Sequence, residues 1–139
     1  MNNIYYDYEK LTESDVPDFS VAKVKPLTPS ELFAKAHKAG MQAGNDITPT
    51  PMTVVGGGRS YFVGEGVCGF ASIVIKPARG KFVQWLKANK NTYKHYYGGI
   101  AIFVGEFGQS LTRKEAYASA FVKVLASAGL NAHVDSRMD

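Results

Sequence analysis

The part of this chain best suited to binding chemistry is a run of cations and aromatic side chains between Gly66 and Gly105. No Asp or Glu occurs there, whereas six cations do, namely Lys76, Arg79, Lys81, Lys87, Lys90 and Lys94. Among them lie Trp85, Tyr93, His95, Tyr96 and Tyr97. Clustered positive charge attracts anions, and aromatic rings stack on nucleobases. We therefore predict that Arg79, Lys81, Lys87, Lys90 and Lys94 contact an anionic partner while Tyr93 stacks. A solvated lysine face is the alternative.

A glycine-rich loop, Gly56-Gly57-Gly58-Arg59-Ser60, is a second candidate. Consecutive glycine amides can surround a phosphate, and the guanidinium of Arg59 could hold it through two hydrogen bonds. The loop has neither a Gly-Lys-Ser/Thr ending nor the Gly-x-Gly-x-x-Gly spacing, so neither nucleotide-binding fingerprint applies. We interpret the segment as a flexible hairpin connection and keep Arg59 as a candidate binding residue.

The last predicted strand carries a third candidate, because His133, Asp135 and Arg137 alternate onto one side of it. Such a trio could bind a polar ligand or pair internally. His and Asp are also two members of a catalytic triad, for which Cys68 could supply the nucleophile. The apolar residues around Cys68 instead favour a buried, inert thiol. We therefore predict no catalytic residue and expect Cys68 to be dispensable.

Metal ligands and acid–base pairs are not indicated by the sequence. His37, His95 and His133 are far apart, and no His or Cys pair has the spacing of metal ligands. His37 is interpreted as a surface residue. The candidate carboxylates Glu65, Glu106 and Asp135 stand singly. We predict a chain without metal or cofactor and lean towards a protein that is not an enzyme.

Composition limits the setting in which the protein acts. A length of 139 residues suits one domain, and the net charge of +4 is mildly basic. One cysteine excludes an intrachain disulfide, and the N-terminus lacks the pattern of a signal peptide. No run of about 18 apolar residues is present, as a membrane-spanning helix would need. We predict a cytoplasmic protein that does not contact a membrane.

Helix signals divide the chain into an arm and one domain. Residues 1–27 are acidic and tyrosine-rich, and residues 28–139 hold the regular elements. Thr28 and Glu31 form a capping box, and Gly44 is expected to end that helix. Further helices are predicted near residues 81–90 and 113–128, the second opened by Thr112 and ended by a Schellman motif at Gly129.

Strand signals complete the predicted fold. Two short predicted strands, Met52–Val55 and Tyr61–Val63, flank the glycine loop. The apolar run Gly98–Val104 predicts a buried strand, and the alternating pattern of Asn131–Arg137 predicts a half-exposed one. Val67–Ile75 is apolar enough to be covered on both faces. The predicted class is α/β (α+β), a single domain with a mixed β-sheet and about three packed helices. Its predicted core consists of Phe70, Ile73, Ile75, Phe82, Leu86, Ile100, Ile102, Phe121, Val124 and Leu125.

Several strings resemble a family of small proteins of tailed bacteriophages. The strings are Gly40-Met-Gln-Ala-Gly44 with Thr48-Pro-Thr-Pro-Met52, Val67-Cys-Gly-Phe-Ala71 with Ile73 to Pro77, Tyr96-Tyr-Gly-Gly99, Gly108-Gln-Ser110, Arg113-Lys-Glu-Ala-Tyr-Ala118 and Asp135-Ser-Arg-Met-Asp139. The resemblance covers roughly residues 40–139. It implies a phage origin and action in the cytoplasm of a bacterial host, and it carries no established activity.

These observations predict a phage-encoded, non-enzymatic accessory protein that binds an anionic partner. The partner is a nucleic acid, a nucleotide signal or an acidic host protein, in counter-defence or host takeover. One alternative is a virion or assembly protein, a homo-oligomer held together by the tyrosine-rich arm. The other is an enzyme acting on a phosphorylated metabolite through Arg59, His133 and Asp135.

Overall fold

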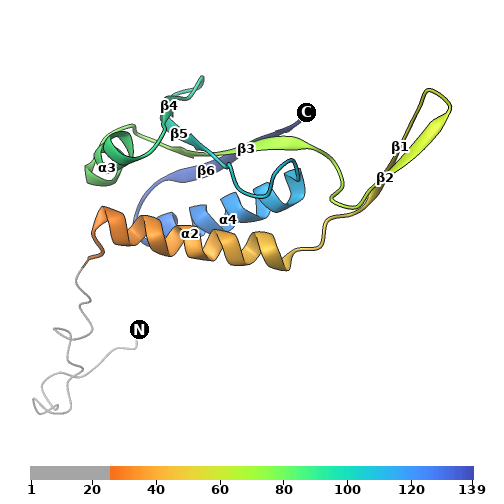
Figure 1. The fold of residues 1–139 in the computed structure, drawn as a ribbon. Coiled ribbons are helices and arrows are strands. Elements are labelled where there is room, and N and C mark those ends of the chain that lie inside the picture. Colours follow the sequence, from red (N-terminus) through yellow and green to blue (C-terminus); the bar gives the residue numbers. More distant parts are fainter. Residues whose placement is uncertain (1–25) are drawn as a thin grey trace, which may run out of the picture.

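A computed structural model describes residues 26–139, which form three helices, a four-stranded sheet and a separate two-stranded hairpin (Figure 1). The predicted arm, residues 1–27, lies almost entirely outside this range. The elements in chain order are α2 (Pro29–Asp46), β1 (Met52–Gly56), β2 (Arg59–Val63), β3 (Gly69–Ile75), α3 (Lys81–Asn89), β4 (Tyr93–Lys94), β5 (Ile100–Phe103), α4 (Leu111–Ser127) and β6 (Ala132–Met138).

The main sheet has the strand order β4-β5-β3-β6, and every pairing in it is antiparallel. β5 and β6 are joined through α4 and run in the same direction, as a strand–helix–strand crossover requires. However, β3 lies between them and pairs with both, so no parallel pair forms. The predicted α+β class with about three packed helices is confirmed, while the expectation of a mixed sheet is replaced by antiparallel pairing.

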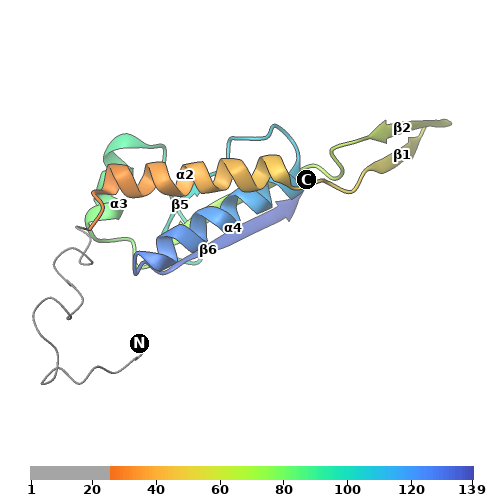
Figure 2. The ribbon, with the colours of Figure 1, turned by 90° about the horizontal axis from the view of Figure 1, so that it is seen from below.

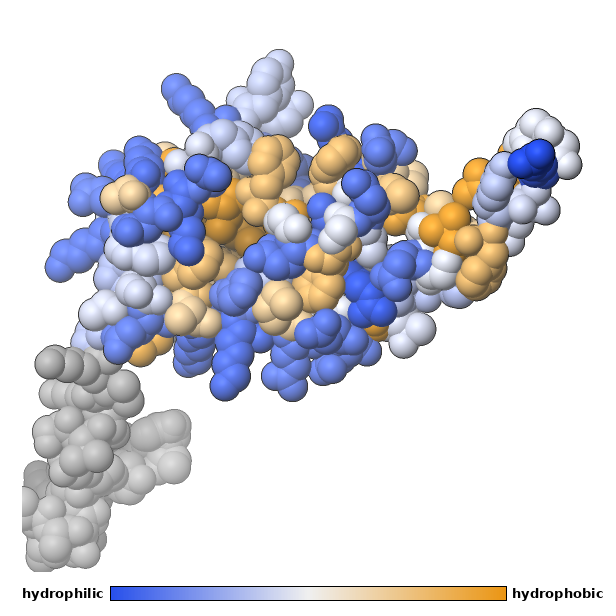
Figure 3. Space-filling view, in the orientation of Figure 1, coloured by the Kyte–Doolittle hydropathy of each residue, from blue (hydrophilic) through white to orange (hydrophobic). Residues whose placement is uncertain are grey.

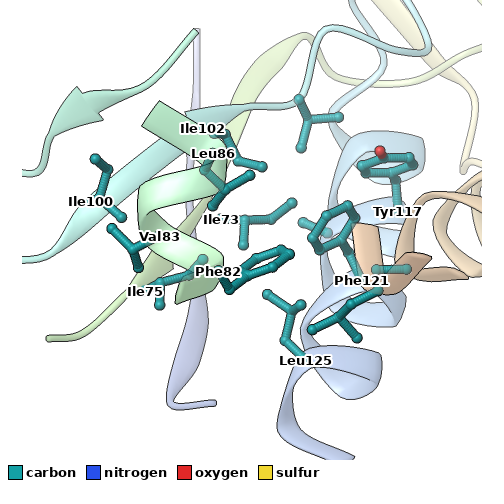
Figure 4. Close-up of a cluster of buried hydrophobic side chains, with 14 of the residues drawn as sticks. Ile73, Ile75, Phe82, Val83, Leu86, Ile100, Ile102, Tyr117, Phe121 and Leu125 are labelled. Carbon is teal, nitrogen blue, oxygen red and sulfur yellow. The ribbon is translucent and has the colours of Figure 1, made fainter. Parts of the chain in front are cut away.

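The core lies on one face of this sheet, where all three helices place their buried side chains (Figures 2 and 4). Alternate residues of β3 and β5 supply the floor, because successive side chains of a strand point to opposite faces. The buried side chains labelled in Figure 4 are Ile73, Ile75, Phe82, Val83, Leu86, Ile100, Ile102, Tyr117, Phe121 and Leu125. Phe121, Leu86 and Leu125 are fully buried, so they contribute most to stability.

Two predicted core residues are not part of the fully buried core. Phe70 is 36% exposed, and Val124 is only partly buried at the edge of the cluster. The prediction that Val67–Ile75 is covered on both faces holds for Ala71–Ile75, which are all buried, and fails at Val67 and Phe70. Within the described residues the helices cover one face, and the even-numbered side chains of β3, including Phe70, point to the other.

α2 begins as predicted and ends later than predicted. Thr28 accepts from the backbone N–H of Glu31 at 3.2 Å, and its own N–H donates to the Glu31 carboxylate at 2.9 Å. The helix continues past Gly44 to Asp46, and Ile47 caps it in an extended conformation. Gly40 and Gly44 are instead buried beneath the rings of Tyr117 and Phe107, so the small residues admit aromatic side chains.

The N-cap of α4 lies two residues before the predicted one. Ser110, not Thr112, is the N-cap residue, and its hydroxyl accepts from the N–H of Arg113 at 3.4 Å. The predicted Schellman ending is confirmed. Gly129 adopts φ 88°, its N–H donates to Ala126, and the N–H of Leu130 donates to Leu125. The prediction of Thr112 was wrong because Thr112 and Glu115 also have the spacing of a capping box.

The glycine loop turns a two-stranded hairpin that projects from the body (Figures 1 and 2). Gly57 and Gly58 both have positive φ, as a tight two-residue turn requires. The interpretation as a hairpin connection is confirmed. Val55 is 76% exposed and Phe62 75% exposed, and Figure 3 shows apolar surface along this projection. Among residues 26–139, moreover, no helix has both the length and the apolar character needed to cross a bilayer.

Replacing Phe121 by alanine should test the core directly. The ring is fully buried and packs edge-on against Phe33 at 5.3 Å between centroids. Its removal is expected to lower the free energy of unfolding by about 3–5 kcal/mol, measured by urea denaturation. Lys123→Ala, at an exposed position of the same helix, is the control and should change stability by less than about 0.5 kcal/mol.

Gly40→Ala tests the contact between α2 and α4. A methyl group at Gly40 would lie 2.6 Å from Cδ2 of Tyr117, whose hydroxyl is tied to His37. Overpacking of this kind costs about 1–3 kcal/mol, which exceeds the gain of about 0.5–1 kcal/mol from removing a helical glycine. The variant should therefore melt at a lower temperature. A melting point equal to or above that of the parent would show that the helices can separate freely.

Candidate functional site

The face of the sheet opposite the core is the candidate site. α2 and α4 lie on one side of the sheet, and α3 sends its buried side chains into the same core (Figures 1 and 4). Pairing in the ladder fixes which residues share the other side, because partners across antiparallel strands lie on the same face. Ser72 pairs with both Phe103 and Asp135, and Phe70 pairs with Arg137. Among the described residues, no helix covers this open face.

Aromatic rings dominate one half of the open face. Tyr93 stacks on Phe103 with 4.8 Å between ring centroids, and Phe103 is still 63% exposed. In the turn between β4 and β5, Tyr96 is 88% and Tyr97 77% exposed. Exposed rings of this size rarely occur together without a partner, because burying them stabilises an interface strongly.

Arg137 supplies positive charge at the other end of the open face. Its guanidinium carbon lies 5.4 Å from the centroid of the Phe70 ring, a cation–π distance. The contact holds the planar guanidinium close to an aromatic surface. A guanidinium held in this way can bind a phosphate through two hydrogen bonds or stack on a base.

Hydrogen bonds fix the polar groups in the middle of this face. The hydroxyl of Tyr93 donates to Ser72 Oγ at 2.7 Å, and Ser72 is buried beneath it. The ring of His95 lies 2.9 Å from Asp135 through Nε2. Because the N–H of Tyr97 donates to Nδ1 of His95 at 3.3 Å, the proton of the neutral imidazole is on Nε2 and is donated to Asp135.

These groups surround a shallow hollow of about 240 Å³. Phe70, Ser72, Tyr93, His95, Asp135 and Arg137 line it. The ring of His133 stands edge-on to His95, with 6.3 Å between centroids, beside the hollow. Within the described strands, Asp135 is the single acid on this face, and the guanidinium of Arg137 in the same hollow offsets its charge. The hollow therefore offers flat rings, one guanidinium and little net negative charge.

The structure brings together some of the predicted binding residues and separates others. Tyr93, Asp135 and Arg137 meet in the hollow, and His133 adjoins it. Lys76 lies against Gly98 and Gly99 of the turn that carries Tyr96 and Tyr97, and Lys94 is on β4. Lys76 therefore adds positive charge beside the open face, whereas Lys94 pairs with the core residue Ile100 and so lies on the other side of the sheet.

The remaining cations do not form one surface with this face. Lys90 places its Nζ 4.5 Å from the ring centroid of Phe33 on α2, and Lys81 lines a groove between the ends of α2 and α4. Arg79 is exposed just before α3, and Lys87 is exposed on the helix itself. Arg59 is exposed at the turn of the projecting hairpin. The acid-free segment is continuous in sequence, but α3 and β4 distribute its cations over different sides.

Sequence reasoning missed Phe103 as a binding residue and missed the pairing of His95 with Asp135. The two-residue period of β5 places Phe103 opposite the buried Ile102, so its exposure could be read from the strand pattern. The His95–Asp135 contact joins residues 40 positions apart, and only the strand order of the folded sheet brings them together.

Cys68 lies outside this site and is partly exposed, not buried as predicted. It borders a hollow of about 530 Å³ beside α4, together with Ser110 and Arg113. The guanidinium of Arg113 is occupied by Glu65 at 2.7 Å and by the carbonyl of Gly44 at 2.6 Å. His133 and Asp135 do not line this hollow, so the residues of the considered triad are not brought together.

His37 is also more than the surface residue that was predicted. Its Nδ1 lies 2.6 Å from the hydroxyl of Tyr117 and 3.8 Å from a carboxylate oxygen of Glu106. Burial, followed by the charge of Glu106, raises the pKa of Tyr117 well above its usual range, so this hydroxyl keeps its proton at neutral pH. Residues 26–139 contain no group of three His, Cys, Asp or Glu side chains that could hold a metal ion.

Comparison with known proteins adds no relative. No protein-family model matches the chain, and neither a curated protein nor a solved structure was found to match it. The relation to tailed-phage proteins therefore stays a prediction. The function has to be argued from the geometry of the open face.

Cys68→Ala should leave binding unchanged. Cys68 borders a different hollow from the one on the open face, and no histidine lines the hollow of Cys68. We expect a loss of stability of about 1 kcal/mol and no change in affinity for a polyanion, measured by thermal unfolding and by titration. A variant that unfolds like the parent but no longer binds would contradict the assignment of Cys68 as a structural residue.

Proposed function

We propose that this chain binds single-stranded nucleic acid across the open face of its sheet and catalyses no reaction. The observation that carries the proposal is the row of exposed rings on one face, Tyr93 on Phe103 and Phe70 beneath Arg137. Stacking of bases on aromatic side chains contributes about 1–3 kcal/mol per base and tolerates any sequence. Four-stranded sheets with exposed aromatic residues are a recurrent platform for such strands.

Electrostatics support an anionic ligand over a neutral one. Lys76 and Arg137 border the open face, and Asp135, the one acid in its described strands, accepts from His95. A duplex is a poorer fit, because its bases are already stacked on each other and cannot lie on protein rings. Of the anionic partners predicted from the sequence, we therefore propose a single-stranded nucleic acid, whose bases are free to stack on the protein.

The resemblance to tailed-phage proteins supports the proposed setting. A protein of this origin would act in the cytoplasm of a bacterial host, where single-stranded intermediates arise during replication and during host defence. A role in counter-defence or host takeover is part of this proposal. A host nucleic acid and a phage nucleic acid offer the same phosphates and bases to the open face.

A role in assembly is a second candidate, favoured by the projecting hairpin. Val55 and Phe62 share one face of it and are each about three-quarters exposed (76% and 75%). An isolated two-stranded hairpin is only marginally stable in water, so a partner that covers these residues would stabilise it. Mass spectrometry of purified virions tests this role, which requires the protein to be present in them.

Phe103→Ala tests the proposed stacking surface, with Phe62→Ala as the matched control. Both phenylalanines are on strands and are largely exposed, but only Phe103 is on the open face. Removing Phe103 should weaken binding of a labelled oligothymidylate by about 1–3 kcal/mol in a fluorescence-anisotropy titration. Phe62→Ala should bind like the parent. Equal effects of the two variants, or no binding at about 50 mM salt, would contradict the proposal.

Salt dependence gives an independent measure of the phosphate contacts. If Lys76 and Arg137 each neutralise one phosphate, the slope of log K against log salt should be about −1.4 for a single strand. Lys76→Ala should make that slope shallower by about 0.7. Lys87→Ala, on the exposed side of α3, should leave the slope unchanged. A slope that responds to Lys87 and not to Lys76 would move the contact surface from the open face to α3.

A further inference from the structure

A second hollow, of about 400 Å³, lies on the core side of the sheet at the edge of β5, next to the start of the short strand β4. It lies between α2, the end of α3 and the segment that follows β5. Phe103 lines this hollow and also the smaller one on the open face. A strand that stacks on Phe103 could therefore pass around the edge of β5 and place its next base in the second hollow.

The floor and one wall of this hollow are apolar and aromatic. Ile73 and Ile102 form buried parts of its lining, and Phe33 of α2 stands beside them. The rings of Phe33 and His37 are nearly parallel, with 8° between their planes and 6.2 Å between centroids. Flat aromatic ligands bind well against such surfaces, and the volume falls within the range of about 300–1,000 Å³ that is usual for small-ligand sites.

Three polar side chains line the remaining walls. Lys90 is held over Phe33, with its Nζ 4.5 Å from the ring centroid, and Asn91 follows it in the chain. Glu106 lies beside His37, with 3.8 Å between a carboxylate oxygen and Nδ1. The hollow therefore combines a carboxylate with an ammonium and an amide.

The carboxylate of Glu106 has acceptor capacity left for a ligand. Among the described residues, no N–H or O–H group lies within hydrogen-bond distance of it, and its side chain is 34% exposed. The nearest candidate donor, Nδ1 of His37, is engaged by the Tyr117 hydroxyl at 2.6 Å. Carboxylates bind best to a pair of neighbouring N–H groups, which they accept through two parallel hydrogen bonds.

We propose that this hollow receives a guanine base, an inference that rests on the proposed function where the base belongs to a bound strand. Guanine presents two adjacent donors, N1–H and the 2-amino group, which match the Glu106 carboxylate. Its O6 is an acceptor next to them and suits the Lys90 ammonium or the Asn91 amide. Adenine, cytosine and thymine do not present two adjacent donors on that edge. The open face thus binds any strand, and the hollow selects guanine at one position.

The test compares labelled oligothymidylates that differ at one nucleotide. Guanine is placed in turn at each end and in the middle, and the same positions then receive hypoxanthine, which lacks the 2-amino group. At the preferred position, guanine should improve Kd about tenfold over thymine, the size of effect expected for a bidentate contact. Hypoxanthine should lose most of that gain. Equal Kd values for all bases at every position would overturn the inference while leaving strand binding intact.

Glu106→Gln is the decisive variant, and Asp46→Asn is its matched control. Both changes replace a carboxylate by an amide of the same shape, but Asp46 lies at the exposed end of α2, away from the hollow. Glu106→Gln should abolish the preference for guanine and leave the Kd for oligothymidylate unchanged within about twofold. Asp46→Asn should keep the preference. A preference that survives in Glu106→Gln would show that guanine is read elsewhere.

Free nucleotides distinguish a base within a strand from a base alone. Guanosine and adenosine monophosphates are titrated into the full chain by calorimetry, with Glu106→Gln in parallel. Binding of the guanosine nucleotide alone, lost in the variant, would support the hollow as a guanine site even if no strand binds and the proposed function fails. If neither this nucleotide nor a guanine-containing strand is preferred over its adenine or thymine counterpart, the inference is wrong.

Discussion

The structure depends on the burial of one side of β3, which pairs with β5 on one edge and along its whole length with β6 on the other, and which has the core beneath it. Ile73 and Ile75 are each 1% exposed and meet α3 and α4. Because strand side chains alternate, this burial also determines that Phe70 and Ser72 point the other way. A slip of one residue would bury the polar side and expose the core, so the register is strongly constrained.

The same constraint produces a one-sided architecture. All three described helices contribute to a single core, and the sheet they cover has an opposite face that only side chains occupy. Along this face, every strand contributes at the positions that the core does not use. The hydrogen bonds from Tyr93 to Ser72 and from His95 to Asp135 tie residues of β3, β4 and β6, together with His95 just after β4, into a fixed arrangement. A ligand would therefore meet a preorganised surface, which lowers the entropy that binding must overcome.

Much of the fold could be predicted from sequence because its signals are local. The Thr28 capping box, the Schellman motif at Gly129 and the paired glycines of the hairpin each specify a backbone conformation within a few residues. The errors arose where tertiary contacts decide the outcome. α2 continues through Gly44 because the Phe107 ring packs there, and Ser110 caps α4 in place of an equally suitable Thr112.

The site was harder to predict than the fold, for a related reason. Positive charge in the sequence suggested one basic surface, but α3 and β4 point their lysines to different sides, and Lys90 packs on Phe33. Strand periodicity did identify His133, Asp135 and Arg137 as neighbours on one side. It could not identify their companions, because Tyr93 of β4 and His95 just after it come from the far edge of the sheet. Strand order, which sequence alone leaves open, brings charge and aromatic rings together.

The most direct test is to map the surface that a bound strand covers. Amide chemical shifts of the isotope-labelled chain would be followed by NMR during titration with an unlabelled oligothymidylate. The account predicts the largest changes at Phe70, Ser72, Phe103 and Arg137 and in the turn at Tyr96–Tyr97, with little change along the β1–β2 hairpin. Changes confined to the exposed side of α3 or to the hairpin would contradict the open face as the binding surface.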